Sequence, residues 1–402
     1  MIFNKQFAIA LCLLFIGSNA FAQEKKDEKK EAKKDTLTFT VIKENPITSV
    51  KNQNRSGTCW AFSSLGFFEA ELLRTQKKEY DLCESFLVEK TYMDRAVAAV
   101  RTHGDISFSQ GGSFYDAVYC LKNYGMCPEG AMPKPGSLYG DSLYNHTELS
   151  KVSTAYVEAI AKSDLKKLSP VWQKGLQGIY NAYIGEIPEK FTYEGKEYTP
   201  QTFAESLGLK MDDYVSLTSF THHPFYTQFA IEVQDNWRWG LNYNIPLDEF
   251  MEVMDYAVRN GYTFAWGADV SEPSFRKHEV VLMPKESTTK DNSGSDQAKW
   301  QGDTDKDNIV KNSQNEKEIT QEMRQEAYDN WETTDDHGML IYGLVKDQNG
   351  KEYFMMKNSW GDYNKYHGKC YISKAYMAYK TMNILIHKDA LPKAIAKKLK
   401  LK

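Results

Sequence analysis

One cysteine in this chain stands where a glycine-containing turn changes into a helical repeat. In the segment "SGTCWAFSSLGFFEAELLR", Cys59 precedes a large aromatic residue, and apolar residues recur at helical spacing over 59–75. The N-terminus of a helix carries partial positive charge, which favours a thiolate over a thiol. The position therefore indicates a nucleophile, although a single cysteine of this kind is more often a packed core residue.

A histidine and an asparagine much later in the chain are the second chemical signal. They flank two apolar runs that an Asn-Gly pair separates, which is a strong signal for a β-hairpin. A loop over 346–349 sets Val345 opposite Gly350 in the two strands. The same register sets His337 opposite Asn358, roughly 5 Å apart.

These side chains have complementary roles in cysteine chemistry. An imidazolium beside the sulfur stabilises the thiolate, and a carboxamide oxygen orients the ring without adding charge. We therefore predict Cys59 as the nucleophile, His337 as the base and Asn358 as the orienting residue. Trp360, just beyond the asparagine, is predicted to cover the hydrogen bond between the last two. The acidic residues 335–336, before the histidine, are interpreted as solvated loop charges.

Two further segments provide what acyl transfer requires. Gln53 lies on the loop that enters the helix, so its side-chain amide and the backbone N–H of Cys59 can point at one developing oxyanion. Gly111 and Gly112 have no side chains, which lets the backbone of a substrate lie close to them. We predict Gln53 as an oxyanion donor. The predicted substrate-binding residues are Gly111, Gly112 and Trp360.

The rest of the pattern predicts the elements that position these residues. Folding starts near Leu37 with a segment of strand character. Further helices are predicted over 84–103, 113–125 and 148–183 with a break at Pro170, strands over 261–270 and 278–284, and a long exposed loop over 291–318. This order predicts a helical first part and a β-rich second part with a cleft between them.

The N-terminal residues have a pattern of their own. Lys5, an apolar stretch over 7–16 and a small-x-small motif at 20–22 predict a secretory signal peptide. Cleavage is expected near Ala22, and the charged segment over 23–36 is predicted to be a solvated linker. The mature protein is therefore expected outside the cytoplasm, in the periplasm or secreted, with no integral membrane segment.

Composition and the remaining polar motifs exclude several classes of protein. The formal net charge is −4 and no basic motif is present, so a nucleic-acid partner is not expected.

Of the six cysteines one lies in the signal peptide, which leaves five, and a disulfide between Cys120 and Cys127 is one option. The two histidines of "THHP" at 221–224 have no further ligands at a suitable spacing. No metal and no other cofactor is therefore expected.

Three separated motifs resemble those of the papain superfamily of cysteine peptidases. They are "QNRSGTCWAFS", "DHGM" and "NSWG", in that order along the chain. "ESFLVEK", "DDYVSLTSF", "WGADVSEPSF" and "KEITQEMRQEAYDNWETTDDHGM" resemble blocks of its bleomycin hydrolase and aminopeptidase C branch, and the likeness covers most of 45–390. Carried over by position, the resemblance implies the same roles for Gln53, Cys59, His337 and Asn358.

The resemblance also implies the fold. One peptidase domain over 37–402 is expected, of the α+β class, with a papain-like two-part fold. Its helical left part is expected over about 50–160 and its β-barrel-like right part over about 241–390. A helical insertion over about 160–240 and the long polar loop would account for the length of the chain.

The activity implied by the resemblance is hydrolysis of peptide bonds through a Cys59 thioester, most directly by an aminopeptidase. In the bleomycin hydrolase branch a C-terminal arm runs into the cleft and limits cleavage to residues near a free N-terminus. Here the chain ends with "KDALPKAIAKKLKLK", an arm that is shortened or replaced, so endopeptidase or mixed activity stays an alternative. Assembly into a homo-oligomer is equally open. An alternative of another class is a catalytically idle protein that binds peptides.

Overall fold

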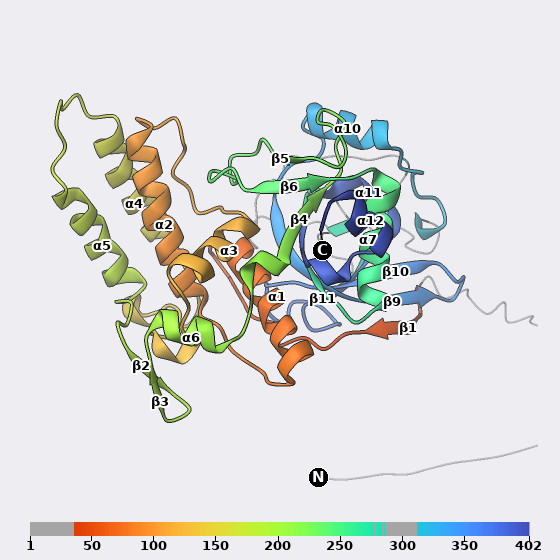
Figure 1. Cartoon of the computed structure of the whole chain (residues 1–402), viewed down its shortest axis with the longest axis horizontal. Coiled ribbons are helices and arrows are strands. Elements are labelled where there is room, and N and C mark those ends of the chain that lie inside the picture. The colour runs from red at the N-terminus through yellow and green to blue at the C-terminus, as the bar shows by residue number, and fades with distance from the viewer. Residues whose placement is uncertain (1–35, 273, 276–278, 284, 286–311, 402) are drawn as a thin grey trace, which may run out of the picture. The chain divides into compact units, whose positions relative to one another are not determined.

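The helices that the apolar repeats predict form the first part of the described chain. The computed structural model describes residues 36–272, 274–275, 279–283, 285 and 312–401, so the predicted signal peptide, most of the charged linker and most of the polar loop lie outside it. The helices of the first part are α1 (Cys59–Gln76), α2 (Glu84–Arg101), α3 (Phe114–Asn123), α4 (Thr147–Ala161), α5 (Val171–Tyr183) and α6 (Pro200–Ser206) (Figure 1). Pro170 directly precedes α5, which confirms the predicted break, because proline suits the start of a helix and not its interior.

The β-rich second part is built on one mixed sheet. Its described strands are β1 (Phe39–Glu44), β4 (Tyr214–Thr218), β5 (Gln228–Ala230), β6 (Leu241–Asn244), β7 (Phe264–Ala268), β8 (Val280–Val281), β9 (His337–Asp347), β10 (Glu352–Lys357), β11 (Lys369–Ser373) and β12 (Thr381–His387). Their order is β5-β6-β4-β12-β7-β9-β10-β11-β8, with β1 paired to β9. A separate hairpin of β2 (Phe191–Tyr193) and β3 (Lys196–Tyr198) belongs to the helical part.

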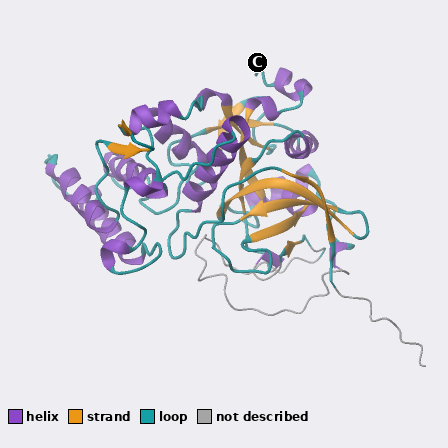
Figure 2. Cartoon of the chain, turned by 90° about the horizontal axis from the view of Figure 1, so that it is seen from below, coloured by secondary structure: helices purple, strands orange, loops and turns teal. Residues whose placement is uncertain are grey.

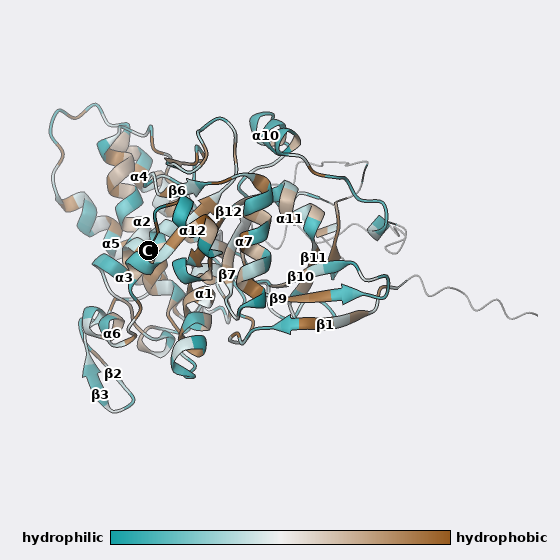
Figure 3. Ribbon diagram, turned by 45° about the vertical axis from the view of Figure 1, so that its right-hand side comes forward, coloured by the Kyte–Doolittle hydropathy of each residue, from teal (hydrophilic) through white to brown (hydrophobic). Residues whose placement is uncertain are grey.

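Each part has its own apolar core. In the second part, side chains from the sheet pack with those of α7 (Leu247–Arg259), α11 (Lys374–Lys380) and α12 (Lys393–Lys398), and α10 (Gln321–Asp329) packs against α11. The first core gathers side chains from α1 to α6. Figure 2 shows the purple helices of the first part beside the orange strands of the second. In Figure 3, β9 is hydrophobic along much of its length, as expected of a central strand that is buried on both faces.

The barrel-like form predicted for the second part is wrong. Within the described residues, β5 and β8 end the strand order without pairing to each other, so the sheet does not close into a barrel. The stretch 160–240, predicted as a helical insertion, contains α5 and α6, but the sheet also takes in β4 and β5 from it. Strands of five and three residues are too short to reveal a two-residue repeat, which explains why the pattern missed them. The predicted strands over 261–270 and 278–284 are confirmed as β7 and β8.

The hairpin of β9 and β10 turns over three residues instead of the predicted four. Asp347 N–H donates to Lys351 O at 2.8 Å, and Gly350 N–H donates to Asp347 O at 3.0 Å. The Asp347 carboxylate also accepts hydrogen bonds from two backbone N–H groups of the loop. Gly350 has a φ of 86°, which suits a glycine in such a loop. The register therefore pairs Val345 with Tyr353, and the predicted pairing with the glycine is wrong.

The predicted backbone pairing of His337 with Asn358 is also wrong. β10 has an irregularity between Met355 and Met356, and its described pairing with β9 ends at Lys357. His337 lies beyond this point and pairs with Ala268 of β7 instead. The histidine and the asparagine of the hairpin meet through their side chains and not through the ladder.

Helix α1 is the element that joins the two parts. Its residues from Cys59 to Leu72 are buried, and it packs on β7 and β9 on one side and on α2 and α3 on the other. A helix that is covered all round lies in the middle of a domain, so the helix predicted over 59–75 is the central one. Its first residue consequently lies where the helical part and the sheet meet.

The cysteines of the helical part are thiols. Cys120 and Cys127 are both free, so the disulfide that the sequence left open between them is not formed. Cys127 lies beside Cys83, and burial together with a hydrogen bond between these two thiols raises the pKa of Cys83. Cys120 points to Gly125 O at 4.0 Å instead. Among the helices in the described ranges, each is too short or too polar to cross a lipid bilayer.

His146 gives the fold a dependence on pH that can be measured. Burial lowers the pKa of this histidine to about 4 from an ordinary value of 6.5. The unfolded chain therefore takes up a proton that the folded chain refuses, and stability is lost as the pH falls from 6.5 towards 4. His146→Gln is expected to lessen this loss by about 2–3 kcal/mol between pH 7 and 4.5, as urea unfolding would measure. His103→Asn, which changes an exposed histidine, serves as the control, and an equal effect of both variants would contradict the prediction.

Candidate active site

Cys59 stands at the first position of α1, as the sequence predicts. It is 7 % exposed, whereas Cys83 and Cys127 are 0 % exposed, so it is the most accessible of these three thiols. The first turn of α1 contains no acidic residue, so no carboxylate within that turn neutralises the positive end of the helix. The positive end of the α1 dipole therefore lies at the residue that carries the sulfur.

His337 reaches the start of α1 because the next residue of β9 is a glycine. A Cβ atom on Gly338 would lie 2.5 Å from Ser63 Oγ and 3.3 Å from Cys59 O. Any larger residue would push the strand away from the first turn of the helix. The missing side chain therefore brings the beginning of β9, and with it His337, against the turn that carries Cys59.

Asn358 holds the imidazole of His337 by a direct hydrogen bond. The distance from His337 Nε2 to Asn358 Oδ1 is 2.8 Å. Asn358 Nδ2 donates to the hydroxyl of Tyr363 at 3.1 Å, and Oδ1 also accepts the backbone N–H of Ser359 at 2.8 Å. These contacts fix which end of the carboxamide faces the ring, so the asparagine can only accept from the histidine.

Trp360 covers this pair, as the sequence predicts. Its ring is stacked on the His337 ring, with centroids 4.9 Å apart and planes inclined by 27°. Burial lowers the pKa of His337 to about 4, and the hydrogen bond that His337 donates to Asn358 opposes that change. At neutral pH the isolated imidazole is therefore an unprotonated base. Within the described residues its Nδ1 atom is buried and has no hydrogen-bond partner, which leaves it able to accept a proton.

Gln53 is fixed on the loop that enters α1. It is fully buried, and its backbone N–H donates to Ser359 O at 2.8 Å. Its side-chain Oε1 accepts from Ser359 Oγ at 2.6 Å, and its Nε2 donates to Ser56 O at 2.8 Å. The loop before the cysteine is thereby tied to the segment that follows Asn358. The role of Gln53 as an oxyanion donor stays a prediction.

The two glycines predicted to bind substrate lie beside the start of α1. Trp60 Nε1 donates to the carbonyl oxygen of Gln110 at 3.0 Å, directly before them. A Cβ on Gly112 would lie 2.8 Å from the Trp60 ring, and one on Gly111 would lie 2.0 Å from Asp235 Oδ2. The missing side chains therefore make room for groups of the protein itself. Contact of these glycines with a substrate stays a prediction.

Arg95 and Asp235 are residues of this region that the sequence analysis missed. Arg95 on α2 is 0 % exposed and donates to Ser107 O at 2.8 Å and to Gly111 O at 2.7 Å. It also forms an ion pair with Asp235 at 3.2 Å. A lone arginine in a helical repeat and a lone aspartate in a polar loop carry no recognisable motif, so no sequence signal pointed to them.

The acidic residues before His337 are not the solvated loop charges that the sequence analysis expected. Asp336 is buried and accepts hydrogen bonds from Thr334 Oγ1 and from the backbone of Val270. Burial raises the pKa of Asp336 to about 7, and the charge of Asp269 adds to the shift. Burial raises the pKa of the half-buried Asp335 to about 8, with contributions from nearby carboxylates. Burial therefore favours the protonated form of both carboxyl groups, which directly precede the histidine in the chain.

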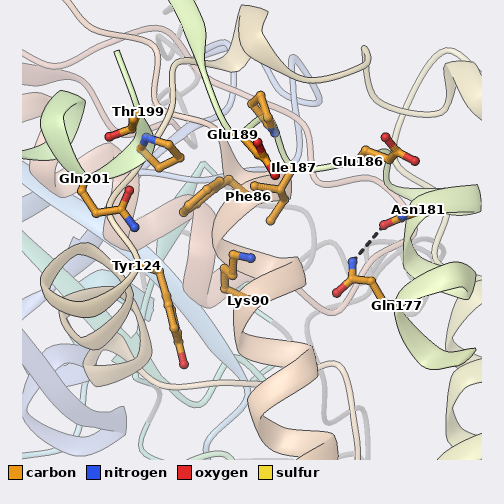
Figure 4. Close-up of a pocket in the computed structure, with 12 residues that line it drawn as sticks. Phe86, Lys90, Tyr124, Gln177, Asn181, Glu186, Ile187, Glu189, Thr199 and Gln201 are labelled. Atoms are coloured by element: carbon orange, nitrogen blue, oxygen red, sulfur yellow. Dashed lines mark hydrogen bonds between the residues drawn. The ribbon is translucent and has the colours of Figure 1, made fainter. Parts of the chain in front are cut away.

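A cavity of about 570 Å³ lies elsewhere, within the helical part (Figure 4). Phe86 and Lys90 of α2 line one side of it, and Gln177 and Asn181 of α5 line another, joined by a hydrogen bond of 2.8 Å. Its lining contains none of the predicted site residues. It is therefore not part of the candidate active site.

A buried imidazole held by a carboxamide, on a strand whose next residue packs against the first turn of the helix that Cys59 begins, is the arrangement expected of a papain-type cysteine peptidase. The comparisons with known proteins agree, because the sequence model of the Peptidase C1-like family matches residues 15–284. The chain belongs to this family. The predictions of a papain-superfamily cysteine peptidase and of a papain-like α+β fold are thereby confirmed.

Several relatives are similar over most of their length. Aminopeptidase G of Lactobacillus delbrueckii subsp. lactis is 22 % identical, over 89 % of this chain and 85 % of the relative. Aminopeptidase C of Streptococcus thermophilus is 24 % identical, over 85 % of this chain and 81 % of the relative. The crystal structure of PepW from Lactobacillus rhamnosis has a TM-score of 0.66 at 20 % identity, and the match covers 90 % of this chain and 84 % of that one. This last similarity concerns the fold.

Proposed function

We propose that the protein is a cysteine aminopeptidase that removes residues from peptides with a free N-terminus. The observation that carries the proposal is the arrangement of His337, whose ring is held by Asn358 and Trp360 where β9 meets the first turn of α1. The names of the relatives cited above, aminopeptidases G and C, support the exopeptidase part of the proposal.

The reaction proceeds in two halves. His337 accepts the proton of the Cys59 thiol, and the sulfur attacks the peptide carbonyl carbon. The Gln53 amide and the Cys59 backbone N–H stabilise the oxyanion that forms on the carbonyl oxygen. The C–N bond then breaks, the leaving amine takes the proton from His337, and an acyl thioester remains on Cys59. Water deprotonated by His337 attacks the thioester, which releases the acid and restores the thiol.

Exopeptidase action also requires a negative group that binds the α-ammonium of the substrate. Asp235 lies against Gly111, next to the segment proposed to hold the substrate backbone. The charge of Asp235 is the largest contribution after burial to the raised pKa of Asp335, so the two carboxyl groups lie near each other. A substrate ammonium between them would relieve this repulsion. Asp235 is therefore proposed to bind the free N-terminus of the peptide.

The test compares peptides of one sequence with free and with acetylated N-termini. Mass spectrometry of the products is expected to show stepwise loss of residues from the free peptides and no cleavage of the acetylated ones. Internal cleavage of acetylated peptides would instead establish endopeptidase or mixed activity. Binding of both peptides without cleavage of either would establish the idle peptide-binding alternative.

Asp235→Asn is expected to raise KM for free peptides about tenfold or more, because a hydrogen bond to a charged group is worth about 1.5–3 kcal/mol. The value of kcat should change little. Steady-state kinetics with the same peptide series would measure both constants. Asp212→Asn changes an exposed carboxylate of another ion pair and serves as the control. Equal KM values for wild type and Asp235→Asn would remove this residue from the proposal.

We further propose that the protein acts outside the cytoplasm. The support is the N-terminal pattern of Lys5, the apolar stretch over 7–16 and the small residues before Gln23. N-terminal sequencing of the protein recovered from the producing cells would show whether the mature chain begins at Gln23.

A further inference from the structure

Two histidines after β4 are not used by the proposed peptidase chemistry. His222 and His223 belong to the "THHP" turn, and Glu232 follows β5. The distance is 3.1 Å from His222 Nε2 to Glu232 Oε2, and 3.0 Å from His223 Nε2 to Glu232 Oε1. One ligand atom from each of the three residues lies within 4.8 Å of the others. The tertiary structure therefore supplies the third ligand that was not evident in the sequence.

Neighbouring side chains hold both imidazole rings in place. The His222 ring is stacked on Tyr328 of α10, with centroids 5.4 Å apart and planes inclined by 15°. The His223 ring is stacked on Phe229 of β5, at 4.2 Å and 22°. His222 Nδ1 lies 3.0 Å from the side-chain nitrogen of Gln325, also on α10, and 3.4 Å from its side-chain oxygen. Metal-binding histidines usually bond a second group through the other ring nitrogen, and Gln325 has that position.

The Glu232 carboxylate presents one oxygen to each of the two imidazoles. Two imidazoles and one carboxylate form a donor set typical of Zn²⁺, with a fourth position for water. When the metal binds, both Nε2 atoms must present a lone pair, so the protons they share with Glu232 move to Nδ1 or leave to solvent.

We propose that His222, His223 and Glu232 bind one divalent transition-metal ion, with Zn²⁺ as the preferred ion. The ion joins the turn after β4 to Glu232, two residues beyond β5, beside an apolar cluster that includes Phe220 and Phe229. The site has a structural role, because it contains none of the residues placed in the peptidase site. Metal binding is expected to raise the thermal midpoint of the protein by a few degrees.

The experiment measures zinc binding to untagged, full-length Cys59→Ala protein. This background prevents zinc from binding a thiol beside His337, which would otherwise add a second site. Isothermal titration with ZnCl₂ is expected to give one ion per chain with a Kd below about 10 µM, and differential scanning calorimetry a higher midpoint. In the same background, His223→Gln and Glu232→Gln should each weaken binding at least tenfold. Circular dichroism verifies that both variants are folded.

A matched control separates a three-ligand site from an ordinary pair of histidine and acid. His367 Nδ1 lies 3.1 Å from Asp362 Oδ2 on an exposed loop, without a second histidine. His367→Asn should leave the affinity for zinc unchanged. Stoichiometric binding that only the His223 and Glu232 variants weaken would support the proposal. Binding well below one ion per chain, or an equal loss in the His367 variant, would overturn it.

Discussion

Cys59→Ala is expected to lower kcat/KM for peptide hydrolysis by at least about 10⁴-fold, the largest effect that a single change in this protein should have. The substitution removes the only group proposed to form a covalent bond with the substrate. It changes a residue that is 7 % exposed at the start of α1, so the fold should be retained. Progress curves with a peptide of free N-terminus would measure the loss.

Two comparisons make this result specific. His337→Ala should reduce kcat/KM by a similar factor, and the double variant should be no worse than either single one, because the two residues act as a unit. Cys120→Ala changes a buried cysteine on α3 and should leave kcat nearly unchanged. A thiol-reactive peptide inhibitor should label wild type on Cys59 alone. Residual activity of Cys59→Ala above about one hundredth of wild type would exclude this nucleophile.

Arg95→Met is expected to have the largest effect on stability, about 3–5 kcal/mol. The guanidinium is fully buried and bonds the carbonyl oxygens of Ser107, Gly111 and Gln234, besides its ion pair with Asp235. Its removal leaves these acceptors without their donor in a place that water does not fill easily. Urea unfolding would give the change in free energy. Calorimetry should show a midpoint lower by on the order of 5–10 °C.

The same variant should also impair catalysis, because Arg95 holds the glycine segment against α2. KM is expected to rise for peptides with a free N-terminus, the substrates of the proposed aminopeptidase. Arg101→Met removes an exposed arginine from the end of the same helix and serves as the control. If the two arginine variants unfold at the same urea concentration, Arg95 does not have the anchoring role described here.

The chemistry of the site could be predicted from short stretches of sequence. A cysteine at the start of a helical repeat, a glutamine on the loop before it and an Asn-Gly hairpin signal are features of near neighbours in the chain. Helices α2, α3 and α5 were predicted nearly to their ends, and α4 nearly to its start, for the same reason, since a 3.6-residue repeat over ten or more residues is set locally. The catalytic roles themselves stay predictions that the variants above would test.

The register of the hairpin could not be predicted from neighbouring residues alone. The choice between a loop of four residues and one of three depended on the Asp347 carboxylate, which binds the N–H groups of the loop. Strands β4 and β5 of the sheet were missed because strands of five and three residues are too short to show a two-residue repeat. The burial of Asp336 was missed because burial depends on what packs over a residue.

The sequence by itself thus determined the class of enzyme, the order of its chemical groups and the helices α1 to α5, because these depend on neighbouring residues. Only the tertiary structure decided which distant groups meet. Arg95 with Asp235, and the two histidines of the "THHP" turn with Glu232, come together through packing of separate elements. Contacts of this kind are set by the shape and burial of whole surfaces, and no repeat or spacing along the chain encodes them.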